Sequence, residues 1–307
     1  MLGLGAGITY SSPLQKEGPP FSLQLSGTDD HVRVGFDASL QPTRLTVAGW
    51  VNLDTIYGSS GWKNTQGGTG LTQVIVGCIG SGGFGIQIVY SGTPLNPVTQ
   101  ILGVVNVTDD GGGSADYLRP SWGGKTSTNT PGTLPLHEIR NLFGWVHIAL
   151  TYNGAIASLY INGSKSRHGG GSNSAGTGDL DASADQTVDS GVTGKNVRYT
   201  INIPLMLGAD GVNTGTNAAE LLQGGLLDDF AVWSAPLDDA AIARIYDNGH
   251  AGLNLAADNG DYDNASDLEG FWRFEEGSGS TIADSSSNSN TGTMVNNPVF
   301  NANTSEQ

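Results

Sequence analysis

The sequence predicts an all-β protein, an antiparallel two-sheet sandwich with one short helix, and three observations support this. Glycine supplies 47 of the 307 residues, roughly twice its ordinary share. Charged residues make up only 14% of the chain, against about 25% in typical soluble proteins. Glycine destabilises helix interiors and exposed helix faces need charge, so this composition excludes a helical bundle or a coiled coil. The third observation is a series of short apolar runs separated by Gly, Asn, Asp and Pro.

The predicted strands are short runs rich in Val, Ile, Leu and aromatic residues. The first run alternates apolar and polar residues with period two, as a half-buried strand does. The dipeptides Asn153-Gly154 and Asn162-Gly163 are tight-turn signals on either side of one strand. We place the strands at residues 21–25, 31–34, 45–53, 73–79, 84–90, 100–107, 145–152, 157–162, 204–208 and 225–233.

One helix is predicted over Leu237 to Asn248. Asp238 and Asp239 stand in its first turn, where the helix dipole favours negative charge. Four apolar residues follow at helical spacing, and Gly249 marks the end of the helix.

The pattern indicates a single domain over residues 21–302, preceded by a Gly/Ser/Pro-rich arm (1–20) and followed by a tail (303–307). Two insertions, 108–133 and 163–195, are too long for ordinary turns. They are functional surface loops, contacts in an assembly, or disordered segments.

Charge and cysteine content exclude several classes of function. The net charge of −16 disfavours nucleic acid as a partner and leaves divalent cations and neutral ligands open. The single cysteine, Cys78, excludes an intrachain disulfide, and its apolar neighbours indicate a buried residue rather than a catalytic thiol. No apolar run is long enough to span a membrane, and the first residues lack the features of a secretory signal peptide.

Five motifs, in order between residues 21 and 250, resemble the strands of laminin-G-like domains of the concanavalin A-like lectin and glucanase superfamily. The resemblance implies that the two-sheet sandwich is a jelly roll. The motifs are Leu25–Val32 (LSGTDDHV), Leu45–Val51 (LTVAGWV), Gly144–Tyr152 (GWVHIALTY), Leu159–Gly163 (LYING) and Leu227–Leu237 (LDDFAVWSAPL).

A further segment, residues 268–302, resembles one that opens the domain in many relatives, although here it closes the chain. Its motifs are Leu268–Gly279 (LEGFWRFEEGSG) and Asp284–Thr293 (DSSSNSNTGT). This order implies a permuted jelly roll in which the last strand lies beside the first. The alternative is a truncated second copy, but some 35 residues cannot bury a core alone, which favours docking onto the main sandwich.

No catalytic motif stands in the sequence, so we expect a protein that is not an enzyme. Glycosidase relatives carry E-x-D-x-x-E on one strand, and this chain has no such run. The adjacent pairs Asp228-Asp229 and Glu275-Glu276 are expected on opposite faces of their strands because side chains alternate there. The five histidines (His31, His137, His147, His168 and His250) are scattered and are interpreted as structural or surface residues.

The resemblance also implies a structural calcium ion at the rim of the sandwich. Its candidate ligands match acidic or amide positions of the family motifs, and oxygen-rich turns suit calcium. The alternative is that these residues form and cap turns, as Asp and Asn usually do. The candidates are Asp29, Asp228, Glu275, Asp284 and Asn288.

Four aromatic residues are candidates for a surface that binds glycans or protein partners. Trp62 and Trp122 lie in Gly/Ser/Asn-rich segments beside Tyr57 and Tyr117, and exposed rings stack on the apolar side of sugars. The alternative is that they anchor their loops or bury into a neighbouring subunit. The other tryptophans, Trp50, Trp145, Trp233 and Trp272, lie inside strand motifs and are expected in the core.

These features favour a non-catalytic structural or adhesive protein of an assembled particle, a phage virion component of the decoration, tail or fibre type. The missing signal peptide, the two insertions and the Gly-rich arm fit this reading, and residues 1–7 (MLGLGAG) resemble the openings of small structural proteins of marine bacteriophages. The expected partners are other structural protein subunits, including further copies of this chain in a homo-oligomer, and cell-surface glycans. Nucleic-acid binding and membrane insertion are not expected.

Two alternatives stay open. One is a lectin-like carbohydrate-binding module of a secreted or cell-surface protein, which would be extracellular. The other is a degenerate glycosidase whose groove lacks its pair of carboxylates.

Overall fold

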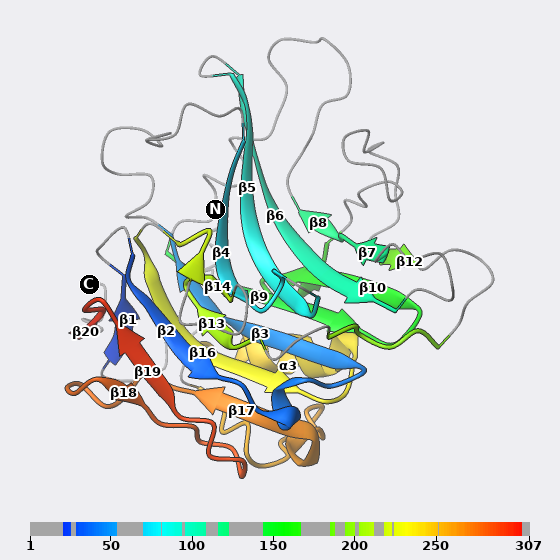
Figure 1. The fold of residues 1–307 in the computed structure, drawn as a ribbon. Helices are drawn as coiled ribbons and strands as arrows, with labels where there is room; N and C mark the ends of the chain where they lie inside the picture. The colour runs from blue at the N-terminus through cyan, green and yellow to red at the C-terminus, as the bar shows by residue number, and fades with distance from the viewer. Residues whose placement is uncertain are drawn as a thin grey trace, which may run out of the picture.

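Two antiparallel sheets packed face to face form the protein in the computed structural model (Figure 1). In the residues that the structure describes, this is the all-β jelly-roll sandwich with one α-helix that the sequence predicts. The structure describes residues 21–25, 29–53, 70–80, 82–93, 96–108, 116–122, 144–166, 185–187, 194–199, 203–211, 218–222, 224–250 and 252–302.

The first sheet, named sheet A, carries the groove described below. Its order is β11 (Ser164–Lys165), β10 (Ile156–Ile161), β9 (Trp145–Tyr152), β3 (Leu45–Asn52), β16 (Leu226–Trp233), β1 (Phe21–Gln24) and β20 (Val299–Ala302). Beside this path, β12 (Asp185–Thr187) pairs with β10, and β17 (Leu268–Trp272) pairs with β16.

The second sheet, named sheet B, packs against the inner face of sheet A. Its order is β18 (Thr281–Ile282), β19 (Gly292–Val295), β2 (His31–Gly35), β13 (Leu205–Leu207), β4 (Gly70–Gly77), β5 (Phe84–Thr93), β6 (Asn96–Val107) and β7 (Asp116–Leu118). A ninth strand, β8 (Ser121–Trp122), pairs with β6, and the short strands β14 (Asp210–Gly211) and β15 (Ala218–Ala219) pair with each other. The described residues also form 3-10 turns at η1 (Ala38–Leu40) and η2 (Ala265–Asp267).

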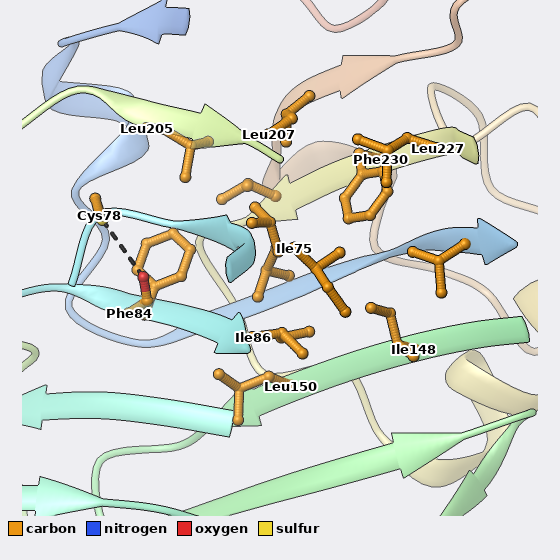
Figure 2. Packing of buried hydrophobic residues seen from close by; sticks show 14 of the residues in the cluster. Ile75, Cys78, Phe84, Ile86, Ile148, Leu150, Leu205, Leu207, Leu227 and Phe230 are labelled. Carbon is orange, nitrogen blue, oxygen red and sulfur yellow. Dashed lines mark hydrogen bonds between the residues drawn. The ribbon is translucent and has the colours of Figure 1, made fainter. Parts of the chain in front are cut away.

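The main core lies between the two sheets because alternate residues of each strand point inward. In β9, the inward residues Val146, Ile148 and Leu150 are buried in this core, while Ala149 belongs to a second cluster on the outer face. Figure 2 shows Ile148 and Leu150 of sheet A in the same group of core side chains as Ile86 of sheet B. Each such aliphatic side chain stabilises the fold by about 1.5–3 kcal/mol on burial.

Gly49 of β3 makes room for the Phe230 ring in the core. A Cβ atom at position 49 would lie 2.5 Å from Cγ of Phe230. Figure 2 shows the Phe230 ring among the core side chains. The glycine in the Leu45–Val51 motif therefore has a packing role.

The outer face of sheet A is covered by α3 (Asp239–Asp247), which Figure 1 shows behind the strands. Small residues of the sheet, Ala48, Ala149 and Ala231, form a buried cluster with Ile242 and Ile245 of the helix. Small side chains on the sheet allow the helix to approach closely. The predicted helix is confirmed, although it begins two residues later than expected.

The C-terminal segment adds strands to both sheets. Strand β17 pairs with β16, and β19 pairs with β2. Strand β20 lies antiparallel beside β1, with Phe21 opposite Ala302. The last described strand therefore lies next to the first, at the edge of sheet A (Figure 1).

Two details of the prediction need correction. The insertions contain short strands: β7 and β8 fall within 108–133, and β11 and β12 within 163–195. Runs of two or three residues are too short for alternation to reveal them. Trp50, Trp233 and Trp272 are buried as expected, but Trp145 is only partly buried because it begins β9 on the outer face.

In the described ranges, no helix has the length and apolar character that crossing a membrane requires.

Candidate functional site

A groove opens on the outer face of sheet A, between the β9–β10 hairpin and the N-terminus of α3. It encloses about 540 Å³. One side is formed by hairpin residues, among them Thr151, Asn153, Ser158 and Tyr160, and by Lys165 of β11. The other side is formed by residues 236–240, which include the N-cap and the first residues of the helix. The lining mixes hydroxyl, amide, carboxylate and ammonium groups.

The helix side of the groove is held to the sheet by Thr46 of β3. Its Oγ1 donates to the carbonyl of Ala235 at 2.8 Å and accepts from the N–H of Leu237 at 2.8 Å. Asp238 then caps the helix, since its Oδ1 accepts from the N–H of Ala241 at 2.8 Å. A typical N-cap of this kind stabilises a helix by about 1 kcal/mol.

Asp239 joins the two sides of the groove. Its Oδ1 accepts a hydrogen bond of 2.6 Å from the Tyr160 hydroxyl and lies 3.3 Å from the Lys165 ammonium. The hydrogen bond from Tyr160, together with Lys165, lowers the pKa of the Asp239 carboxyl despite some desolvation. The side chain therefore stays ionised and keeps a fixed orientation.

Asn153 fixes a second polar group at the hairpin end of the groove. Its Oδ1 accepts from the N–H of Ala155 at 2.9 Å and from the N–H of Ile156 at 2.8 Å. This side chain closes the turn that the Asn153-Gly154 pair predicts. Both hydrogen bonds use the oxygen of the side-chain amide. The amide nitrogen, which has two N–H donors, therefore points away from the turn.

A second cluster, of buried ionisable groups, lies farther along the same face of sheet A. Asp228 of β16 is fully buried opposite Trp50 of β3, and its Oδ2 lies 3.4 Å from Nδ1 of His250. Asp229 Oδ1 lies 3.5 Å from Nε of Arg273. Burial raises the pKa of Asp228 well above its ordinary range, and the charges of Asp229 and Glu275 raise it further.

The regular strand alternation on which the separation of the neighbouring carboxylates was predicted is interrupted in this cluster. The β16–β3 register shifts between Asp228 and Ala231, and Asp229 has a φ of 46°, so a bulge interrupts the strand. Glu275 and Glu276 lie in the turn after β17 rather than on a strand. Burial and the charge of Asp229 raise the pKa of Glu275 to about 7, although Arg273 opposes the shift.

Aromatic rings and two histidines pack beside these carboxylates. The rings of Trp145 and His250 stack at 4.8 Å, and those of Trp50 and Tyr246 stack at 5.8 Å. The His147 ring lies 5.2 Å from the Trp50 ring and is fully buried. Within the described part of the chain, its two ring nitrogens have no hydrogen-bond partner. Burial lowers the pKa of His147 to about 3.

The calcium candidates lie in different parts of the fold. Asp228 and Glu275 belong to the cluster just described. The carbonyl of Asp29, not its carboxylate, accepts from the side chain of Asn296 at 3.2 Å. Asn288 donates through Nδ2 to the carbonyl of Glu269 at 3.1 Å and to its Oε2 at 2.8 Å.

Asp284 organises the loop after β18. Its Oδ1 accepts from the N–H groups of Phe271 and Ser286, both at 2.8 Å. Its Oδ2 accepts from the Ser286 hydroxyl and from the N–H of Asn290, both at 2.7 Å. Four donors thus occupy this carboxylate, as expected of a turn-forming residue.

These placements do not fit a calcium site shared by the five candidates. Within the part of the chain that the structure describes, no group of three or more His, Cys, Asp or Glu side chains is arranged to hold a metal ion. The turn-forming interpretation suits Asp284 and Asn288 best, because their polar atoms are engaged with the backbone.

The aromatic candidates are placed only in part. Tyr57 and Trp62 lie outside the described residues. Tyr117 stands opposite Asn106 in the β6–β7 ladder, and Trp122 stands opposite Ile101 in the β6–β8 ladder, but their side chains lie outside the description. The aromatic binding surface stays a prediction.

Sequence reasoning missed the groove. Its signals were visible separately, in the Asn153-Gly154 turn and in the acidic first turn of the helix. Nothing in the sequence indicates that Tyr160 and Lys165 meet Asp239, because these residues are more than seventy positions apart and meet only through the fold.

Comparison with known proteins gives distant structural likenesses. No family model matches the chain, and no curated protein matches its sequence. A heptameric SAP-like pentraxin from Limulus polyphemus is 14% identical, with 77% of this chain and 86% of that chain covered and a TM-score of 0.38. Mouse laminin α1 domains LG4-5 are 13% identical, with 76% and 48% covered and a TM-score of 0.32.

A third solved structure is the enzymatically active domain of tailspike protein 2 from bacteriophage CBA120. It is 12% identical, with 86% of this chain and 34% of that chain covered and a TM-score of 0.37. Likenesses of this strength do not indicate a function for this chain.

Proposed function

We propose that this chain is a non-catalytic, glycan-contacting β-sandwich domain of a structural or adhesive protein. The observation that supports it is the groove between the β9–β10 hairpin and α3, whose polar side chains are held in place by hydrogen bonds. Prearranged donors and acceptors in a cleft of this size are what a small polar ligand requires. Saccharide hydroxyls both donate and accept, which suits the mixed lining.

The acidic groups of the groove favour binding over catalysis. Asp238 is engaged as the helix cap, and Asp239 is engaged by Tyr160 and Lys165. A general acid must carry a proton at the working pH. The lowered pKa of Asp239 makes it an acceptor with a fixed charge instead.

The setting we propose is an assembled particle, a phage virion, in which the domain contacts other subunits and cell-surface glycans. The arm, the insertions and the acidic composition support this setting. Light scattering coupled to gel filtration tests it, with a defined oligomer of the full chain as the expected result. A strict monomer at all concentrations would speak against it.

A glycan array tests the binding function directly. Wild type is expected to bind a subset of glycans, and Tyr160→Phe to bind them about tenfold more weakly because Asp239 loses the hydroxyl that orients it. Tyr246→Phe removes a hydroxyl outside the groove and is the matched control. Trp62→Ala and Trp122→Ala test the aromatic surface expected from the sequence. Absence of glycan binding by the wild type would refute the proposal.

A further inference from the structure

We propose that the groove selects neutral saccharides over anionic ones. This inference rests on the proposed function and adds the chemical class of the ligand. It follows from the charges and the fixed hydrogen-bonding groups that line the groove.

The charge of the lining disfavours an anion. Asp238 and Asp239 supply two carboxylates, and Lys165 supplies one ammonium group that is already 3.3 Å from Asp239. A sulfate or carboxylate on the ligand would meet a net negative lining on a chain whose net charge is −16.

The N-terminus of α3 does not reverse this preference. The N-terminal end of a helix attracts anions through its unpaired N–H groups and its dipole. Here the Asp238 carboxylate accepts from the N–H of Ala241, and Asp239 adds a second negative charge in the first turn. The helix end is therefore already supplied with negative charge from the protein itself.

The two ends of the groove offer complementary groups to hydroxyls. At the hairpin end, the Asn153 amide nitrogen is oriented by the two hydrogen bonds that its oxygen accepts, so it presents donors. At the helix end, Asp239 uses Oδ1 for Tyr160 and Lys165, and its side chain is 71% exposed, which leaves Oδ2 to accept. A hydroxyl-rich neutral ligand satisfies both ends without placing a charge beside a like charge.

The volume of about 540 Å³ is within the range of small-molecule sites, so a short oligosaccharide segment is an adequate occupant. Because the Tyr160 hydrogen bond lowers the pKa of Asp239, the negative charge persists under mildly acidic conditions and the preference should not change with pH there.

The test uses the full chain on an array of matched glycan pairs, each a neutral oligosaccharide and its sialylated or sulfated derivative. Calorimetry then measures the dissociation constant of the best pair for wild type, Asp239→Asn and Asp261→Asn. Asp261 is exposed and outside the groove lining, so its variant removes the same charge elsewhere. Far-UV circular dichroism checks that α3 is retained.

We expect the neutral member of a pair to bind about tenfold more tightly than the anionic one. Asp239→Asn should weaken binding of the neutral member and reduce the difference in affinity between the two members. Asp261→Asn should leave the affinity for each member unchanged. Tighter binding of anionic members, or an equal effect of the two variants, would overturn the inference but leave glycan binding intact. Failure of every glycan to bind would instead overturn the proposed function.

Discussion

The part of the fold's stability that depends on a neutral His147 is expected to fall when the pH is lowered from 7 to 5. This ring is fully buried beside Trp50 and Tyr246, and its nitrogens have no hydrogen-bond partner among the described residues. Burial lowers the pKa of His147 to about 3 from an ordinary value of 6.5. Below pH 6.5 the unfolded chain therefore binds a proton at His147 that the folded chain does not, and this residue's contribution to stability is lost as the pH falls.

The size of this effect follows from the two pKa values. Stability falls by about 1.4 kcal/mol per pH unit once the unfolded histidine is fully protonated, which amounts to about 2 kcal/mol between pH 7 and pH 5. Buried acids act in the opposite direction. Burial raises the pKa of Asp210 to about 7 and that of Glu275 to about 7, so their contribution favours the fold as the pH falls.

A substitution at His147 distinguishes its contribution to the pH dependence of stability from that of these acids. His147→Phe keeps a ring at this position and cannot titrate, while the acids stay the same. Urea unfolding, followed by tryptophan fluorescence at pH 7 and pH 5 and at constant ionic strength, gives the free energy of unfolding for both proteins. Wild type should lose about 2 kcal/mol relative to the variant on acidification.

The neighbouring strand residue Ile148 provides the control. Ile148→Val should cost about 1 kcal/mol at both pH values, because it removes a buried methyl group and no titrating group. If wild type and His147→Phe respond equally to pH, the histidine is not held neutral in the folded protein and the reasoning is wrong.

Three further predictions concern stability and use the same unfolding measurement. Gly49→Ala should cost about 2 kcal/mol, because the new Cβ would overlap the Phe230 ring, and an unchanged stability would contradict the packing described here. Asp284→Ala should cost about 2 kcal/mol, equally in calcium and in a chelator, because four donors lose their acceptor; a loss seen only in calcium would point to a metal ligand instead. Asp238→Ala should cost about 1 kcal/mol through the lost cap on Ala241, and helix content by circular dichroism would show whether α3 frays.

The sheets could be predicted because, in a long strand, the order of apolar residues along the sequence shows which side chains are buried. In the strand over 145–152, Val146, Ile148 and Leu150 alternate with residues of the other face. The strand is long enough for this alternation to be recognised in the sequence. The helix could be predicted from its apolar spacing and the acidic residues of its first turn. Strands of two or three residues, such as β8, carry no such signal.

The candidate site was harder to predict because it depends on contacts between distant segments. The bulge at Asp229 breaks the alternation on which the placement of adjacent carboxylates was based. Asp284 looks like a metal ligand in the sequence, and only the four donors around it identify its role in the loop. The meeting of Tyr160 with Asp239 requires the helix to be docked on the sheet.

The order of strands in sheet A separates the groove from the edge where Phe21 and Ala302 meet. Strand β10 is five positions from β20, and neighbouring strands are about 4.8 Å apart, so about 24 Å of sheet lies between them (Figure 1). Attachment through residues 21 and 302 would fix the sandwich at the β20 edge of sheet A and leave the opposite edge, with β10 and β11, facing away from the attachment point. Fusion partners or surfaces attached at that corner should therefore leave access to the groove unobstructed.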